Sequence, residues 1–259
     1  MKQPYNWPTI LWMGAIHTLG LMALAYFSLP NLVALLILWY VSTCLGITLG
    51  YHRLISHKAF RAPVWVTRVL ATCGALAVQK GPITWAGLHR QHHKFADAPG
   101  DPHSSRESFF HCHFGWMMRE VEAEADVARW TKDLAKDPYL VWLEDWFMLP
   151  TLLVGLGLFA VGGWSMVLWG IALRLVVGYH VTWLVNSATH FFGYKTYETG
   201  DDARNCWWVA LLSWGEGWHN NHHHRQNSAK TGEKWWEFDV TWYHVWLMRQ
   251  LGLATRVVT

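Results

Sequence analysis

The chain has 259 residues, of which 52% are hydrophobic and only 15% are charged, and its net charge is +3. Roughly a quarter of residues are charged in ordinary soluble domains, so this composition argues against a soluble enzyme and against a disordered chain. A mean hydropathy of +0.08 is low for a chain made only of membrane helices. We therefore expect membrane spans together with a substantial aqueous part, and no run of Lys and Arg predicts a nucleic-acid partner.

Four apolar segments are predicted to cross a membrane. A hydrocarbon core of about 30 Å takes roughly 20 residues of helix. The predicted spans cover residues 9–29, 31–50, 147–161 and 164–185, and short turns at Leu29–Asn31 and Gly162–Gly163 join them in pairs. The apolar stretch 64–78 is shorter and contains Arg68, so it is predicted to be an interfacial or re-entrant helix.

The positions of the basic residues predict the orientation. All but one of the 21 Lys and Arg residues lie on one side of the predicted spans, and the exception, Arg174, lies within the fourth span. Loops rich in Lys and Arg stay in the cytoplasm, so both termini are expected there. We expect a single all-α domain over residues 1–259, with four transmembrane helices and a cytoplasmic helical cap formed by residues 51–146 and 186–259.

Histidines are concentrated in three short motifs on the predicted cytoplasmic side. These motifs are His52–His57, His89–His93 and His219–His223. In the last two, the spacing i, i+3, i+4 places three imidazoles on one face of a helix. In the first, the spacing i, i+5 turns about 140° around an ideal α-helix. Its two histidines are therefore expected either to face different metals or to lie where the span frays.

A further pair of candidate ligands ends the fourth predicted span. Asn186 and His190 are four residues apart and share a helix face. Nine clustered histidines exceed what one metal ion can hold, so two ions are the economical interpretation. Imidazole suits Fe, Zn, Cu or Ni, so spacing alone does not identify the element. The predicted metal site comprises His52, His57, His89, His92, His93, Asn186, His190, His219, His222 and His223.

The other histidines are predicted to be ordinary polar groups. They are His17, His103, His111, His113, His180, His224 and His244. His17 lies in the first span, far from the motifs by the predicted topology. Arg174 and His180 are polar groups in or near the membrane, where function and helix packing are both open and packing is favoured.

With these motifs in view, the chain resembles the membrane fatty acid desaturases of the delta-9 class. The resemblance covers nearly the whole chain. It is carried by HRxxxH at His52–His57, HRxHH at His89–His93, NSxxH at Asn186–His190 and GEGWHNNHH at Gly215–His223. Flanking segments agree, notably Asp101-Pro102-His103. The resemblance implies two iron ions held by the nine motif histidines, a contact from Asn186 through water, and O2-dependent insertion of a cis double bond into a saturated acyl chain.

Carboxylates near the motifs are expected to orient the imidazole rings. A ligating histidine usually donates its other ring N–H to such a group. The nearest candidates in sequence are Asp97, Asp101, Asp201 and Glu216.

The resemblance also implies a substrate carrier and an electron donor. The sequence has no Gly-rich dinucleotide fingerprint and no flavin motif, so ferredoxin, rubredoxin or cytochrome b5 is expected to supply electrons. Animal acyl-CoA relatives carry paired arginines after Asp-Pro-His, whereas this chain has only Arg106 there, followed by Glu120, Glu122, Glu124 and Asp126. An acidic surface suits coenzyme A poorly. A membrane glycerolipid is therefore favoured over acyl-CoA, in a bacterial cytoplasmic or thylakoid membrane.

Two alternatives stay open at this point. A histidine-motif hydroxylase of alkanes, sterols or fatty acids would yield an alcohol where a desaturase yields an alkene. A membrane metal or haem carrier would place paired histidines within the spans, where this sequence offers only His17 and His180.

Overall fold

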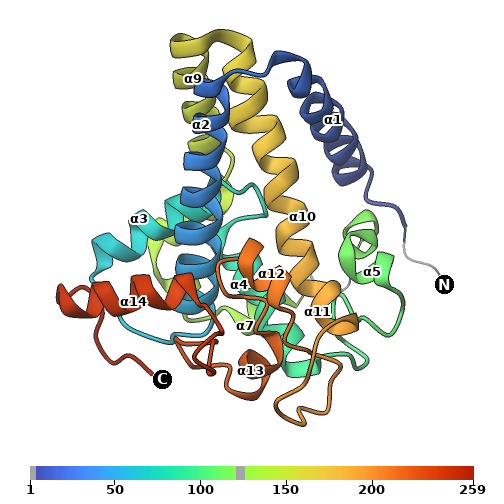
Figure 1. The fold of residues 1–259 in the computed structure, drawn as a ribbon, viewed down its shortest axis with the longest axis vertical. Coiled ribbons are helices and arrows are strands. Elements are labelled where there is room, and N and C mark those ends of the chain that lie inside the picture. Colours follow the sequence, from blue (N-terminus) through green and yellow to red (C-terminus); the bar gives the residue numbers. More distant parts are fainter. Residues whose placement is uncertain (1–3, 121–125) are drawn as a thin grey trace.

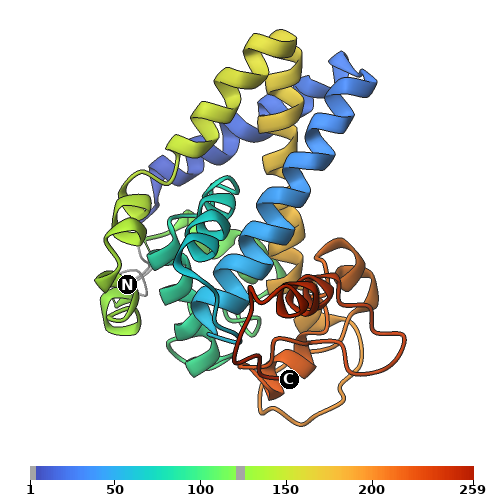
Figure 2. The same ribbon diagram turned by 90° about the vertical axis from the view of Figure 1, so that its left-hand side faces the viewer.

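The computed structural model describes residues 4–120 and 126–259 and shows an all-helical protein, as predicted. Within these residues the β contacts are isolated bridges, without a strand. Long helices form one end of the molecule, and shorter helices and loops form a broader end (Figures 1 and 2).

The long helices come from two stretches of the chain. They are α1 (Trp7–Ala23), η1 (Leu24–Tyr26), α2 (Leu29–Trp39), η2 (Tyr40–Ser56), α9 (Leu149–Val167), η5 (Leu168–Leu173) and α10 (Arg174–Asn186). The shorter helices are α3 (Val64–Ala75), α4 (Pro82–Phe95), α5 (Phe109–His113), η3 (Gly115–Met118), α7 (Val127–Trp130), η4 (Leu134–Lys136), α8 (Pro138–Asp145), α11 (Ala188–Phe191), α12 (Trp207–Leu212), α13 (His219–His224) and α14 (Val240–Gln250).

Three helical stretches among the described residues are long and apolar enough to cross a membrane. They cover Trp7–Tyr26, Leu29–Ser56 and Leu149–Phe191. The third breaks at Gly163, whose backbone has φ 64° and ψ −159°, a conformation that glycine adopts without a side-chain penalty. The chain reverses there, so that α9 and the η5–α10 arm lie side by side (Figures 1 and 2). The predicted break at Gly162–Gly163 is confirmed, while a count of four spans stays a prediction.

The predicted turn between the first two apolar segments is placed too late. The structure ends the first helix at Tyr26 and begins α2 at Leu29. Ser28 caps α2 by accepting the backbone N–H of Asn31 at 3.3 Å. Pro30 lies in the first helical turn, where its missing N–H costs nothing. The proline therefore starts a helix here and does not form the turn.

The second long helix changes its winding before it reaches the histidines. Residues Tyr40–Ser56 form a π-helix, and the N–H of His57 bonds the carbonyl of His52 at 3.1 Å. This hydrogen bond joins residues five apart, which is the π-helical pattern. A Cβ on Gly46 would lie 2.4 Å from the backbone of Cys73, so η2 and α3 pack with their backbones in close approach.

Arg174 shows how the interior of the long helices accommodates a charge. It is 1% exposed. Its guanidinium donates to the carbonyl oxygens of Gly170 at 3.0 Å and Leu76 at 2.6 Å. These contacts agree with a packing role for Arg174, which stays a prediction.

Candidate metal centre

The nine motif histidines converge from four elements at the broad end of the long helices. η2 and the residue after it supply His52 and His57, α4 supplies three more, α11 supplies His190, and α13 supplies the last three. They form two groups, in each of which one ring nitrogen per residue lies within 4.8 Å of the others. The five-histidine group is His52, His57, His89, His93 and His222, and the four-histidine group is His92, His190, His219 and His223.

The contacts in the five-histidine group suit a cation better than hydrogen bonds among the rings. The Nε2 atoms of His57 and His89 are 2.7 Å apart, and the Nε2 atom of His222 lies 2.9 Å from that of His93 and 3.0 Å from that of His52. A neutral imidazole has one N–H, so converging Nε2 atoms cannot each find a donor. Nitrogens bound about 2.1 Å from one metal ion lie roughly 3 Å apart. This group has the donors and spacing of a metal site.

The four-histidine group presents unsatisfied nitrogens. The Nε2 atoms of His190 and His219 are buried and have no hydrogen-bond partner within the part of the chain that the structure describes. An unpaired buried polar atom costs about 1–3 kcal/mol, which a metal bond would offset. Both groups therefore fit a bound metal ion.

The spacing within the motifs assigns neighbouring histidines to different groups. On α4, His89 and His93 join the five-histidine group while His92 joins the other. On α13 the pattern is inverted, because His219 and His223 join the four-histidine group and His222 crosses over. Each i, i+4 pair therefore serves one group, and the residue before its second member serves the other. The sequence predicted three imidazoles on one face of each helix. In the structure, each helix divides its three imidazoles between the two groups.

The first motif departs from both predicted alternatives. His52 and His57 belong to the same group, and their ring centroids are 4.7 Å apart. The helix does not fray before them, since η2 extends to Ser56. The π-helical turn brings residues five apart to the same side, whereas the prediction assumed α-helical winding.

Carboxylates hold four of the rings, as predicted. Asp101 lies 3.0 Å from Nδ1 of His92, Asp97 lies 2.9 Å from Nδ1 of His190, Asp201 lies 2.8 Å from Nδ1 of His223, and Glu216 lies 2.9 Å from Nδ1 of His52. A carboxylate at Nδ1 fixes the proton there and leaves Nε2 free to bind a metal.

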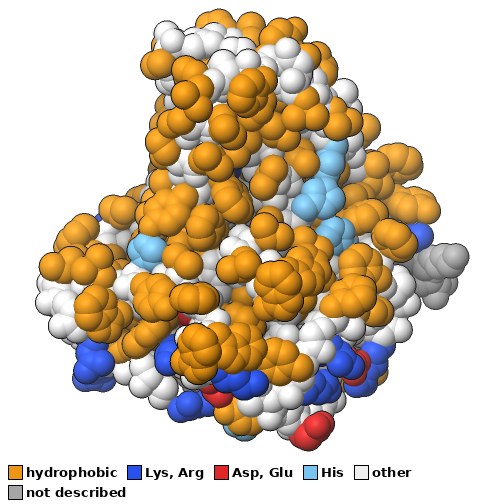
Figure 3. All heavy atoms as spheres, in the orientation of Figure 1, with side chains coloured by type: hydrophobic (Ala, Val, Ile, Leu, Met, Phe, Trp, Pro, Cys, Tyr) orange, Lys and Arg blue, Asp and Glu red, His pale blue; other side chains and the backbone are white. Residues whose placement is uncertain are grey.

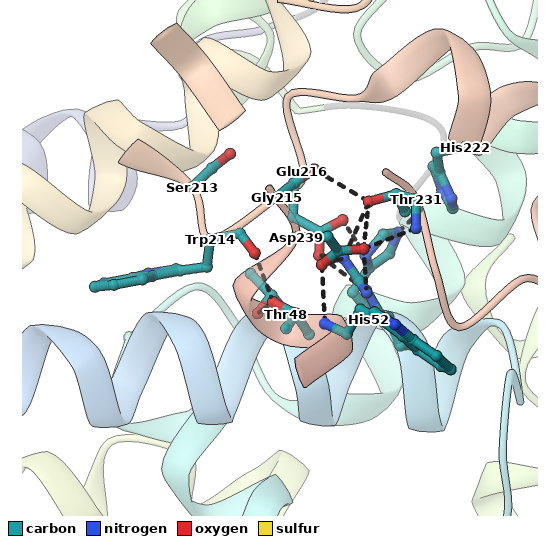
Figure 4. A network of polar contacts seen from close by, with 12 residues as sticks. Thr48, His52, Ser213, Trp214, Gly215, Glu216, His222, Thr231 and Asp239 are labelled. Atoms are coloured by element: carbon teal, nitrogen blue, oxygen red, sulfur yellow. Dashed lines mark hydrogen bonds and ion pairs between the residues drawn. The ribbon is translucent and has the colours of Figure 1, made fainter. Parts of the chain in front are cut away.

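Glu216 also ties the third motif to the first through Arg53. The guanidinium of Arg53, 1% exposed, donates to Glu216 at 2.9 Å and to Asp239 at 3.0 Å. Asp239 in turn accepts the backbone N–H of Thr231 at 2.8 Å (Figure 4). This buried network fixes the loops on both sides of α13 against η2.

Burial keeps most of these imidazoles neutral. Desolvation, reinforced by neighbouring rings, holds the pKa values of five histidines well below 6.5; they are His57, His89, His93, His219 and His222. Burial lowers the pKa of His223 to about 4 despite Asp201. For His92, burial opposes protonation, but the Asp101 carboxylate outweighs it and raises the pKa. A neutral imidazole is the form that binds metals.

Two cavities reach the histidines. The larger, about 320 Å³, is lined by residues that include Trp12, Tyr179 and His103, and the smaller, about 60 Å³, by residues that include Ile47 and Trp214. Both share Trp85, His89, Thr182 and Asn186 as walls. Asn186, the last residue of α10, therefore faces the space beside both groups.

Comparison with known proteins decides the family. Residues 28–246 match the family model of fatty acid desaturases. The chain is 48% identical over 258 residues to the sn-1 stearoyl-lipid 9-desaturase of Anabaena variabilis, covering 99% of this chain and 95% of that protein. This chain belongs to the fatty acid desaturase family. It is also 48% identical over 250 residues to the sn-1 stearoyl-lipid 9-desaturase of Synechocystis sp. (96% and 79% covered), and 43% identical over 258 residues to the sn-2 palmitoyl-lipid 9-desaturase of Nostoc sp. (98% and 90% covered).

The family assignment confirms the resemblance seen in the motifs. Fatty acid desaturases are oxidoreductases, so this protein is an enzyme, and the carrier interpretation is set aside. The three apolar helices agree with a membrane desaturase.

One histidine of this desaturase near the site was not predicted. His103 stacks on His92 with ring centroids 4.3 Å apart, and His92, Asp101 and His103 form a third set of converging ligand atoms. Burial lowers the pKa of His103 to about 3. The Asp101-Pro102-His103 segment was the available signal, because Asp101 was already predicted to orient a ring.

Three other histidines form a chain outside the two groups. Nε2 of His17 lies 3.2 Å from Nε2 of His180, and Nδ1 of His180 lies 3.1 Å from Nε2 of His113. His113 then contacts the Ser187 hydroxyl at 2.8 Å. His17 is therefore not isolated, but the chain joins α1, α5 and α10 and does not include a residue of either group.

The last three histidines have unrelated partners. His111 pairs with Glu107 at 3.3 Å, His224 stacks on Tyr197, and His244 bonds the Tyr40 hydroxyl. None of the three belongs to a converging ligand set among the described residues.

Proposed function

We propose that this desaturase introduces a cis double bond at the delta-9 position of a saturated acyl chain carried by a membrane glycerolipid, using dioxygen and two iron ions. One observation carries the proposal: two groups of converging imidazoles lie beside the walls that two apolar cavities share. Two relatives are named as a stearoyl-lipid and a palmitoyl-lipid 9-desaturase. These names support both the delta-9 position of the double bond and a lipid as the carrier of the acyl chain.

The five-histidine and four-histidine groups would each hold one iron, with Asn186 contributing through water. The iron pair would supply the oxidising power, drawn from dioxygen and two external electrons, that removes two hydrogens from an unactivated CH2–CH2 unit. Neutral imidazoles leave such a pair more positive than the carboxylate-rich sites of helical-bundle di-iron proteins. The role of the protein is to hold the rings by their Nδ1 atoms and to exclude water through burial.

The shared walls would position the acyl chain. A chain that enters the larger cavity and continues into the smaller one passes Trp85, His89 and Thr182. Gln79 braces this passage, since its side chain donates to Thr182 at 2.9 Å and accepts from the Trp85 indole at 3.4 Å. A fixed passage sets which methylenes lie beside the histidines, and therefore where the double bond forms.

The charges near the Asp-Pro-His segment support a lipid carrier over acyl-CoA. Arg106 is paired with Asp202 at 3.0 Å, so the cation that stands where the animal enzymes have a pair is already neutralised. Glu120 and Asp126 add negative charge, and Glu122 and Glu124 lie outside the described residues. The phosphates of coenzyme A are normally met by Arg or Lys at defined positions.

The proposed topology has four spans, with α9 and the η5–α10 arm as separate spans and both termini in the cytoplasm. Lys and Arg side chains gather at the broad end, away from the apolar helices (Figure 3). Lys2, which contributed to the predicted charge asymmetry, lies outside the described residues. Cysteine labelling near Ser28 and Gly163 should report the side opposite to Thr259.

The decisive experiment is expression in a host without unsaturated acyl chains. The host grows aerobically and supplies ferredoxin in its reduced state. Gas chromatography of total lipids should show a new cis delta-9 alkene, and purified protein should carry close to two irons per chain. Pulse labelling should find the double bond first in intact glycerolipids. An alcohol product would indicate a hydroxylase, and label appearing first in unsaturated acyl-CoA would overturn the lipid carrier alone.

A further inference from the structure

We infer that the loop after α13 is the docking surface for an acidic one-electron carrier protein. The inference deepens the proposed function and rests on it, because insertion of the double bond consumes one O2, two protons and two electrons and releases two waters. Two reduced carriers must therefore each deliver one electron. The donor face is defined as His224, Arg225, Lys230, Lys234 and Trp235, all exposed.

Trp235 is the most exposed large apolar residue of the described chain. Its side chain is 92% exposed. The loop that carries it joins α13 to α14 at the broad end of the molecule, where Lys and Arg side chains gather (Figures 1 and 3). Tryptophan is enriched among the residues that anchor interfaces between proteins.

The charge of this segment favours an acidic partner. Residues 224–259 contain the cations Arg225, Lys230, Lys234, Arg249 and Arg256, against three acids. Two of those acids, Glu237 and Asp239, are buried. The third, Glu233, is half-buried and accepts the Tyr197 hydroxyl. Lys234 lies 4.0 Å from the Glu237 carboxylate, but five cations still exceed three acids. The segment therefore carries a net positive charge, which accelerates encounter with a negatively charged carrier.

Aromatic contacts lead inward from the donor face to the metal ligands. Trp236 packs against the buried Trp218 with ring centroids 5.6 Å apart, and Trp218 directly precedes His219. At the other edge, the exposed His224 directly follows His223. The face thus adjoins the four-histidine group at both ends of α13.

The loop is also held firmly to the ligand helix. The Glu237 carboxylate accepts the side-chain N–H of Asn221 at 2.9 Å and the backbone N–H of Lys234 at 3.0 Å. Lys234 extends over the Tyr194 ring, 4.1 Å from its centroid. A carrier bound here would meet a preformed surface with a fixed relation to α13.

The test uses iron-loaded full-length enzyme and a plant-type [2Fe–2S] ferredoxin kept reduced by its NADPH-dependent reductase. The variant Lys230→Glu/Lys234→Glu should raise the KM for ferredoxin about tenfold at low salt, and the difference should shrink as salt screens it. Trp235→Ala should lower kcat/KM for ferredoxin about tenfold, with partial rescue by Trp235→Phe. The matched control Lys132→Glu/Lys136→Glu makes the same charge change on exposed residues around η4 and should leave the KM unchanged.

A second measurement separates this inference from the proposed function. Enzyme reduced chemically without ferredoxin and then exposed to O2 should give the same single-turnover alkene yield in every variant. Equal effects of both double variants, or a normal kcat/KM for ferredoxin in Trp235→Ala, would overturn the donor face while leaving the desaturase intact. If the Trp235→Ala enzyme dissociated from the membrane and kept a normal KM for ferredoxin, Trp235 would be a lipid anchor and the donor face would be overturned. No alkene from wild type by either route would overturn the proposed function itself.

Discussion

The two histidine groups of this desaturase differ in how their rings are supported. In the four-histidine group, three of four Nδ1 atoms contact an aspartate, from Asp97, Asp101 or Asp201. Among the described residues of the five-histidine group, only His52 contacts a carboxylate, and Nδ1 of His93 and of His222 have no hydrogen-bond partner there. A carboxylate makes its imidazole a stronger ligand. We therefore expect a metal ion in the four-histidine group to be held more tightly than one in the five-histidine group, which offers more ligands with weaker support.

The largest expected effect comes from removing one ring from either group. His222→Ala and His219→Ala should each lower desaturation by more than about 100-fold, since losing a ligand costs more than the 10–100-fold typical of losing its support. Elemental analysis should show iron lost together with activity. His111→Ala removes an imidazole that pairs with Glu107 and belongs to neither histidine group, so it serves as the matched control. Full activity in His222→Ala would remove the five-histidine group from the site.

The next largest effect is expected at Glu216, the carboxylate that contacts both His52 and Arg53. Glu216→Gln weakens both the contact with His52 and the ion pair with buried Arg53. Breaking a buried pair costs about 3–5 kcal/mol, partly offset here because Asp239 still pairs with Arg53. We therefore expect a lower unfolding temperature as well as weaker iron binding. Unchanged thermal stability would show that Asp239 alone neutralises Arg53.

Weakening one aspartate should affect the metal more than the fold. Asp101→Asn and Asp201→Asn should each weaken iron binding by about 10–100-fold in the four-histidine group. Titration with a competing chelator should then remove one iron per chain earlier than in the wild type. In these variants the four-histidine group should lose its iron first. In the wild type the five-histidine group should lose its iron first. Simultaneous loss of both irons in wild type and variants would show that the two groups act as one unit.

The smallest effect is the response of the metal-free protein to pH. Below pH 6.5 the unfolded histidines take up protons, while burial holds the folded pKa values of His89, His93, His219 and His222 well below that value. For these four histidines the unfolded state then binds more protons, so their contribution to stability falls as the pH falls below 6.5 and is flat above it. His92, whose folded pKa is raised, opposes this trend by adding stability at low pH. Unfolding temperatures at pH 8, 6.5 and 5.5 test the sign.

The sequence predicts the members of this site better than their arrangement. The nine histidines and four carboxylates were predictable because metal ligation and ring orientation require those side chains near one another. Their division into two groups was not, because it depends on how α4 and α13 face each other across the site. The shared group of His52 and His57 was hidden by π-helical winding, which no local hydropathy pattern encodes. His103 was missed because a proline-containing turn returns it to His92.

The boundaries of the long helices show the same limit. Apolar length predicted where membrane helices lie, but Pro30 was taken as a turn residue although it begins α2 behind the Ser28 cap. Capping geometry decides such positions, and it becomes visible only when the side-chain oxygen and the backbone N–H are both located.

The winding of η2 also determines how the first motif can change over evolution. In a π-helical turn, residues five apart lie on the same side of the helix. The number of residues between His52 and His57 is therefore constrained as well as their identity. A deletion of one residue would give the i, i+4 spacing seen in the other motifs, and yet it would rotate every later position of the segment relative to α3 and α4. Point substitutions at Leu54 leave that register intact. Insertions and deletions should therefore be rarer than substitutions in this stretch across the desaturases that share it.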